Sequence, residues 1–133
     1  MKEPLLDTDT LSFYLKGYPN VVSRIDSAFD RFGHLNISVI TYYEILNGLL
    51  FKDAQRQLKS FQQLLHYCQI IYFDTSVAEL AATIYADLRK TNQMIGHTDV
   101  MIGATAILHD MVLVTNNQDH FKRILNLDLE NWV

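Results

Sequence analysis

Acidic and amide side chains recur where predicted strands end or helices begin. Asp7 directly follows an apolar pair, Glu44 lies just beyond a segment rich in β-branched residues, and Asn117 follows an apolar run. Asp99 lies in the first turn of an otherwise apolar predicted helix. The carboxyl ends of parallel strands form the ligand-binding edge of an open sheet, and converging carboxylates repel one another unless a cation neutralises them. The pattern therefore predicts a site for Mg²⁺ or Mn²⁺ that is suited to phosphodiester chemistry.

Each of these residues also has an ordinary structural interpretation when it is taken alone. Asp7 and Asp9 suit helix N-capping, which we consider the better interpretation for Asp9. Glu44 suits an exposed helix position, and Asp99 is favoured by the helix dipole. Asn117 suits a turn. Only their joint placement at strand ends favours a site.

The elements that must position these side chains alternate along the chain. We expect strands at residues 5–6, 35–40, 69–73 and 111–115. Helices are expected at 11–15, 21–32, 41–50, 54–65, 77–88 and 99–108, followed by a short amphipathic turn at 121–125 and a C-terminal piece. Expected helix caps are Ser38 or Thr41, Asp53, one residue of 74–76, and Thr98. The alternation predicts an α/β fold with a mostly parallel central sheet.

Length and composition exclude several other classes of protein. A length of 133 residues predicts a single domain, 1–133. Fifteen acidic against eleven basic residues give a net charge of -4, so contact with phosphate needs help from a metal. A single cysteine excludes an internal disulfide and fits a reducing compartment. Because the first residues and the rest of the chain lack a long apolar run, we expect no signal peptide and no membrane-spanning segment. The expected location is the cytoplasm. Zinc-binding, phosphate-loop and serine-hydrolase motifs are missing.

Four segments in order along the chain carry a resemblance to a known family. They are LLDTD at 5–9, SVITYYEILNG at 38–48, IGHTDVMIGATA at 95–106, and LVTNN at 113–117 with HFKRI and LENW after it. Together these segments resemble the PIN-domain ribonucleases, and specifically the VapC-type toxins of type II toxin–antitoxin systems. The resemblance spans the whole chain and implies a three-layer α/β/α architecture around the mostly parallel sheet.

The resemblance also implies an activity and a set of site residues. The activity is a Mg²⁺-dependent endoribonuclease, with Mn²⁺ as an alternative metal, that cleaves structured RNA such as tRNA or rRNA. Asp7 and Asp99 are the implied principal metal ligands, and Glu44 completes the cluster and orients the attacking water. Asn117 stands where many PIN domains have a fourth acid, and it is placed to hydrogen-bond the metal's water.

Further implications concern accessory residues and partners. Thr115 and Asp119 are expected as accessory residues of the site. VapC-like proteins are inhibited by an antitoxin, so we expect a VapB-like partner, with residues 42–65 suiting its helix and a homodimer face. RNA would meet a local basic rim formed by Lys16, Arg24, Lys52, Arg56, Lys59, Arg89, Lys90, Lys122 and Arg123.

Two other functions remain as alternatives. One is a catalytically silent PIN-like module that acts through its antitoxin partner in a DNA-binding complex. The other is a phosphoacceptor receiver domain, suggested by Asp7, Asp9 and Asp74 but disfavoured because the chain lacks paired acids directly after the first strand and a lysine directly after the last.

Overall fold

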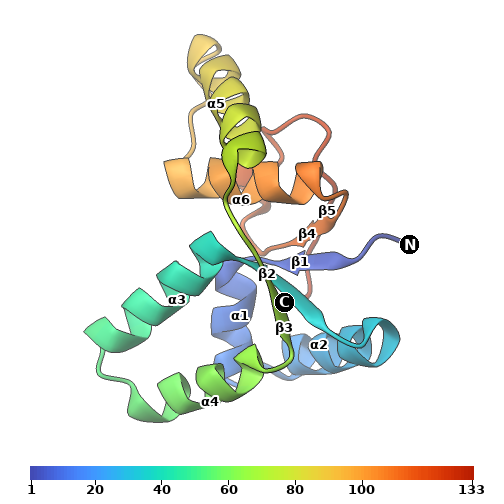
Figure 1. The fold of residues 1–133 in the computed structure, drawn as a ribbon, viewed down its shortest axis with the longest axis vertical. Coiled ribbons are helices and arrows are strands. Elements are labelled where there is room, and N and C mark those ends of the chain that lie inside the picture. Colours follow the sequence, from blue (N-terminus) through green and yellow to red (C-terminus); the bar gives the residue numbers. More distant parts are fainter.

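Five parallel strands form one central sheet in the computed structural model, which describes residues 1–133 (Figure 1). The strands are β1 (Pro4–Leu6), β2 (Leu35–Ser38), β3 (Cys68–Ile71), β4 (Val112–Val114) and β5 (Leu129–Glu130). Their order across the sheet is β3-β2-β1-β4-β5. Strands β2 and β3 therefore lie on one side of β1, and β4 and β5 lie on the other. The strand order reverses between β1 and β4. Such a switch point is where open α/β sheets leave a crevice for ligands.

Two layers of helices cover the sheet, as Figure 1 shows. The helices are α1 (Thr8–Leu15), α2 (Pro19–Phe32), α3 (Val39–Phe51), α4 (Gln55–Leu65), α5 (Thr75–Lys90), α6 (His97–Leu108) and α7 (Gln118–Phe121). Helices α1 to α4 lie on one side, and α5, α6 and α7 lie on the other. The expected three-layer α/β/α architecture is confirmed.

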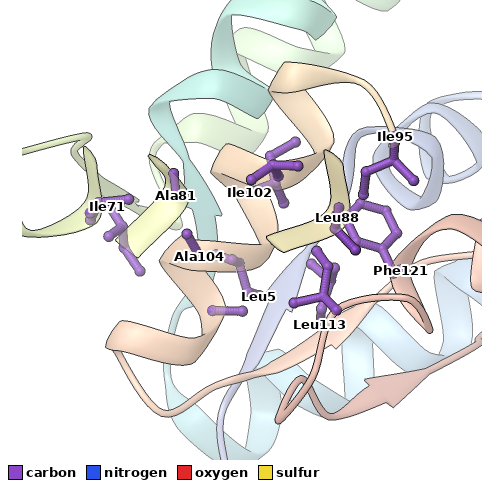
Figure 2. Packing of buried hydrophobic residues seen from close by; sticks show 13 residues of the cluster. Leu5, Ile71, Ala81, Leu88, Ile95, Ile102, Ala104, Leu113 and Phe121 are labelled. Carbon is purple, nitrogen blue, oxygen red and sulfur yellow. The ribbon is translucent and has the colours of Figure 1, made fainter. Parts of the chain in front are cut away.

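Alternation along the short strands divides the hydrophobic core between the two layers. Leu5 and Leu113 face α5 and α6, whereas Leu6 and Val114 face α1 to α4. In the view of Figure 2, Leu5 lies between Ala104 of α6 and Leu113, and Phe121 lies next to Leu88. All four strand residues are completely buried. Because β1 and β4 are covered on both faces, only their carboxyl ends are left to carry polar chemistry.

Several element boundaries differ from the sequence prediction, each for a local reason. The second strand ends at Ser38 rather than at residue 40, because the Ser38 hydroxyl accepts the N–H of Thr41 and starts α3. Asp53 does not cap α4: it has a positive φ of 52°, and Ala54 is the N-cap residue. Thr98 lies inside α6, whose N-cap is Gly96.

Other boundaries follow the prediction or extend it. The expected cap within 74–76 is Asp74, whose carboxylate accepts the N–H of Val77. The C-terminal piece contributes a fifth strand that the sequence pattern did not predict, since only two of its residues pair with β4. None of the seven helices combines the length and the apolar character that crossing a bilayer requires.

Candidate active site

Asp7 lies at the centre of the site, directly after β1. It occupies the N-cap position of α1 in an extended conformation, yet its side chain makes no capping hydrogen bond. Instead, Oδ2 accepts a hydrogen bond of 2.7 Å from the hydroxyl of Thr115, the first residue after β4. Asp7 is only 4% exposed. The switch point between β1 and β4 therefore holds a buried carboxylate that makes no capping hydrogen bond to a helix.

The surroundings of Asp7 penalise its charge. Burial, together with the negative charge of Asp9, raises the pKa of the Asp7 carboxyl to about 7, although the Thr115 hydrogen bond opposes the change. No lysine, arginine or histidine forms an ion pair with Asp7. A buried acid without a cationic partner is a common mark of a functional site, because folding alone gains nothing from it.

Asp9 lies in the first turn of α1, two residues beyond Asp7. Its Oδ2 accepts the backbone N–H of Asn116 at 3.1 Å, and the Thr115 hydroxyl lies 3.3 Å from Oδ1. Burial raises the pKa of Asp9 as well. Its interpretation as a helix cap is thus wrong: the carboxylate ties α1 to the loop after β4 and adds negative charge beside Asp7.

Glu44 enters the site from α3. Ser38 fixes the start of that helix, so residue 44 lies in its second turn and faces α1. The Thr8 hydroxyl donates a hydrogen bond of 2.6 Å to Glu44 Oε1. Since Thr8 follows Asp7 directly, this contact ties the Glu44 carboxylate of α3 to the segment that carries the Asp7 carboxylate. The sequence prediction did not single out Thr8.

Asp99 reaches the site from the opposite helix layer. It lies in the first turn of α6, where the helix dipole favours an acid, and its side chain is 24% exposed. Oδ2 lies 3.3 Å from Nδ1 of His120, and the same nitrogen lies 3.0 Å from Nδ2 of Asn117. His120 thus links two predicted site residues. Its spacing of three from Asn117, across the start of α7, is the sequence signal for this contact.

The two predicted accessory residues have different positions. Thr115 is completely buried, donates to Asp7 and accepts the N–H of Asn117 at 3.0 Å. It therefore holds the carboxylate and the loop together. Asp119 has an 86% exposed side chain that pairs with Lys122 at 3.3 Å, away from the other acids.

The predicted acids surround one open hollow of about 370 Å³. The residues that line it are Asp7, Thr8, Asp9, Ser12, Phe13, Lys16, Glu44, Asp99 and Asn117. Four carboxylates and the Asn117 amide thus share the space with a single basic side chain. The sequence prediction did not place Ser12, Phe13 and Lys16 in this hollow, although together with Asp9 they have the spacing of one face of α1 and its C-cap.

The donor set fits a hard divalent cation by its chemistry. Carboxylate and amide oxygens at a negatively charged edge are the ligands that Mg²⁺ and Mn²⁺ prefer. No three histidine, cysteine, aspartate or glutamate side chains are arranged so that they could by themselves hold an ion. This open arrangement suits Mg²⁺, which keeps several waters and is completed by substrate phosphates.

A family model for the PIN domain matches residues 5–126, most of the chain. The protein belongs to the PIN-domain family. The match begins within β1 and ends beyond α7, so this PIN domain includes every residue that lines the hollow. The receiver-domain alternative is thereby rejected.

Relatives of this PIN domain are named as VapC ribonucleases. Ribonuclease VapC2 of Haemophilus influenzae is 29% identical over 135 residues, which is all of this chain and all of the relative. The tRNA(fMet)-specific endonuclease VapC of Salmonella typhimurium is 30% identical over 130 residues, 96% of each chain.

Solved structures of toxin–antitoxin complexes share the PIN-domain architecture. The DNA-bound VapBC structure from Salmonella typhimurium has a TM-score of 0.90 at 29% identity and covers all of both chains. The VapBC2 structure from Rickettsia felis, bound to a DNA fragment from its promoter, has a TM-score of 0.88 at 27% identity over 98% of each chain. The whole fold is therefore that of a VapC chain.

Proposed function

We propose that this PIN domain is the toxin of a type II toxin–antitoxin system and acts as a metal-dependent endoribonuclease on structured RNA such as tRNA or rRNA. The supporting observation is the hollow at the β1–β4 switch point, where Asp7, Glu44 and Asp99 converge in a chain similar to VapC ribonucleases. The preferred metal is Mg²⁺, with Mn²⁺ as a substitute.

Different residues of the hollow would bind the metal and orient the attacking water. Asp7 and Asp99 come from opposite helix layers and offer oxygen ligands across the hollow. Glu44, which accepts a hydrogen bond from Thr8, would be the third acid and would orient the attacking water. Asn117 presents its amide at the rim, where it can hydrogen-bond that water or the phosphate. Bound Mg²⁺ would neutralise these acids and lower the pKa of a water for attack on the phosphodiester.

The inhibitory partner we propose is a VapB-like antitoxin that covers exposed apolar side chains of α3. Tyr43, Leu50 and Phe51 are 62%, 59% and 89% exposed, within the segment expected to receive the antitoxin helix. An apolar helix face laid on such side chains is a common mode of recognition. We further propose a homodimer and a cytoplasmic location, where the antitoxin and RNA are both present.

Cleavage of total bacterial RNA by purified, antitoxin-free protein tests the activity. The reaction is run with Mg²⁺, Mn²⁺ or EDTA, beside the Asp99→Asn variant and a Met101→Leu control on the same helix. We expect discrete fragments from the native protein and the control with either metal, and none from Asp99→Asn or with EDTA. Circular dichroism of all samples shows whether the fold is retained.

A catalytically silent module that acts only through its antitoxin is the second candidate. It is favoured by the relatives whose solved complexes are bound to DNA. If folded native protein cuts no RNA with any metal, while its complex with a VapB-like antitoxin binds promoter DNA, this second candidate replaces the first.

A further inference from the structure

Lys16 is the only basic residue that lines the acidic hollow. It lies at the C-cap of α1 and shares the hollow with four carboxylates, those of Asp7, Asp9, Glu44 and Asp99. Nevertheless it forms no ion pair in the structure, whereas Lys2 and Lys122 on other surfaces do. An ammonium group that lines the same hollow as four acids and pairs with none of them is free to bind an anion.

The helix geometry explains why Lys16 stays unpaired. Seven residues separate it from Asp9 along one face of α1, which corresponds to roughly 10 Å along the helix axis. The backbone of Lys16 therefore lies about two turns from Asp9, at the other end of the hollow. With one phosphate held among the carboxylates at the strand ends, the next phosphate along the same RNA strand would lie over this end of α1.

An aromatic ring supports this position. The Lys16 ammonium lies 6.0 Å from the centroid of the Phe13 ring, which also lines the hollow. The Phe13 ring in turn packs against Tyr18, with 4.7 Å between ring centroids. A cation held over an aromatic face loses less freedom when it binds a phosphate. Phe13 thus acts as a positioning residue for Lys16.

We propose that Lys16 binds the RNA phosphate next to the one that is cleaved. This proposal rests on the proposed ribonuclease function and narrows the basic rim expected from the sequence to one residue at the hollow. In a chain of net charge -4, the carboxylates repel the substrate backbone along its whole path. Lys16 supplies the local positive charge that offsets this repulsion on the α1 side.

The kinetic test compares three variants on bulk bacterial tRNA with Mg²⁺. Lys16→Ala should raise KM roughly tenfold with little change in kcat, because the lost charge-assisted hydrogen bond contacts a phosphate that does not react. Lys16→Arg should restore KM. Arg31→Ala removes an exposed basic residue of α2 that lies outside the expected basic rim, lines no part of the hollow and should match the native protein.

A binding test measures how much the charge of Lys16 contributes to RNA binding. Fluorescence anisotropy follows fluorescein-labelled bulk tRNA as it binds the Asp99→Asn protein, with and without Lys16→Ala, over a range of NaCl concentrations. Removal of one phosphate contact should reduce the slope of log K against log salt by about 0.7 to 0.9.

The outcomes separate this proposal from the ribonuclease function. If native protein cleaves tRNA but Lys16→Ala and Arg31→Ala have equal KM values and equal salt slopes, the role of Lys16 is refuted and the nuclease stands. If kcat falls while KM and the slope do not change, Lys16 is not a binding residue, and the proposal fails. If native protein neither binds nor cleaves RNA, both proposals fail together.

Discussion

Two hollows of very different character lie within a few residues of each other on α6. The groove between α5 and α6 has a volume of about 710 Å³ and a lining of mostly apolar side chains, among them Ala81, Tyr85 and Met101. The hollow at the strand ends is about half as large, at about 370 Å³, and only Phe13 in its lining is hydrophobic. His97 belongs to the first and Asp99 to the second.

The comparison shows that the volume of a hollow and the chemical character of its lining are independent indicators of function. In the groove, small alanine side chains on α5 leave space that neighbouring residues do not fill. In the hollow, Thr115 holds the buried Asp7 and Thr8 holds the half-buried Glu44 against the mutual repulsion of the acids. A stable fold gains nothing from such repulsion, so its persistence points to a charged ligand. We therefore expect function to be confined to the smaller hollow.

The largest expected effect is loss of cleavage when a metal ligand is removed. Asp99→Asn should lower the rate by about a thousandfold, since it forfeits several kcal/mol of charge stabilisation in the transition state. Isothermal titration with Mn²⁺ should show weakened binding in the same variant. Retention of half the native rate would show that Asp99 is a structural residue of α6.

The second effect concerns stability and pH. The raised pKa of Asp7 means that the folded protein holds this proton more tightly than the unfolded chain, where the pKa is near 3.8. Native stability should therefore decrease as pH rises from about 4 to about 7. Asp7→Asn, which is never charged, should be more stable than native at pH 8 by at most about 4 kcal/mol, and equal to it near pH 4.

Urea unfolding in EDTA at the two pH values measures this difference. Addition of Mg²⁺ should reduce the advantage of Asp7→Asn at pH 8, because the ion stabilises the native carboxylate. An advantage of the same size at pH 4 and pH 8 would show that Asp7 is not the titrating group.

The third effect comes from two buried threonines with different partners. Thr115→Val removes the hydroxyl that holds Asp7 and should cost about 1–3 kcal/mol of stability, with a roughly tenfold to hundredfold loss of cleavage. Thr105→Val is the matched control, because the Thr105 hydroxyl donates only to the Met101 carbonyl within its own helix. Equal losses in the two variants would mean that Thr115 acts through packing alone.

The smallest effect should come from the large groove. Ala82→Leu places a larger side chain on the α5 wall of the groove without adding charge. We expect cleavage rates within about twofold of native, measured on the same bulk tRNA. A strong loss would show that RNA enters the groove and would reverse the comparison between the two hollows.

Much of the candidate site could be predicted because strand ends are visible in sequence. Asp7 and Asn117 follow short apolar runs, and the end of each run marks where β1 and β4 stop. The parallel sheet then brings these ends together by topology alone. Glu44 and Asp99 could be added because each lies near the start of an apolar helix.

The rest depended on side-chain contacts that no local pattern encodes. The link from Asp9 to the N–H of Asn116 joins residues 107 apart, so local propensity favoured a cap instead. The strand β5 has two paired residues, too few for a recognisable alternation. Asp53 was expected as a cap because of its residue type, but the positive φ at this position ends α3 instead.

The hydrogen bond between Thr115 and Asp7 also has a consequence for biosynthesis. Its partners lie 108 residues apart, and β1 cannot be flanked on its second side until β4 has been made. A growing chain on the ribosome can fold α1 to α4 around β1 and β2 while its active hollow is still incomplete. The proposed toxin would therefore be harmless to its own translating ribosome until the last quarter of the chain emerges, when an antitoxin could already occupy the exposed face of α3.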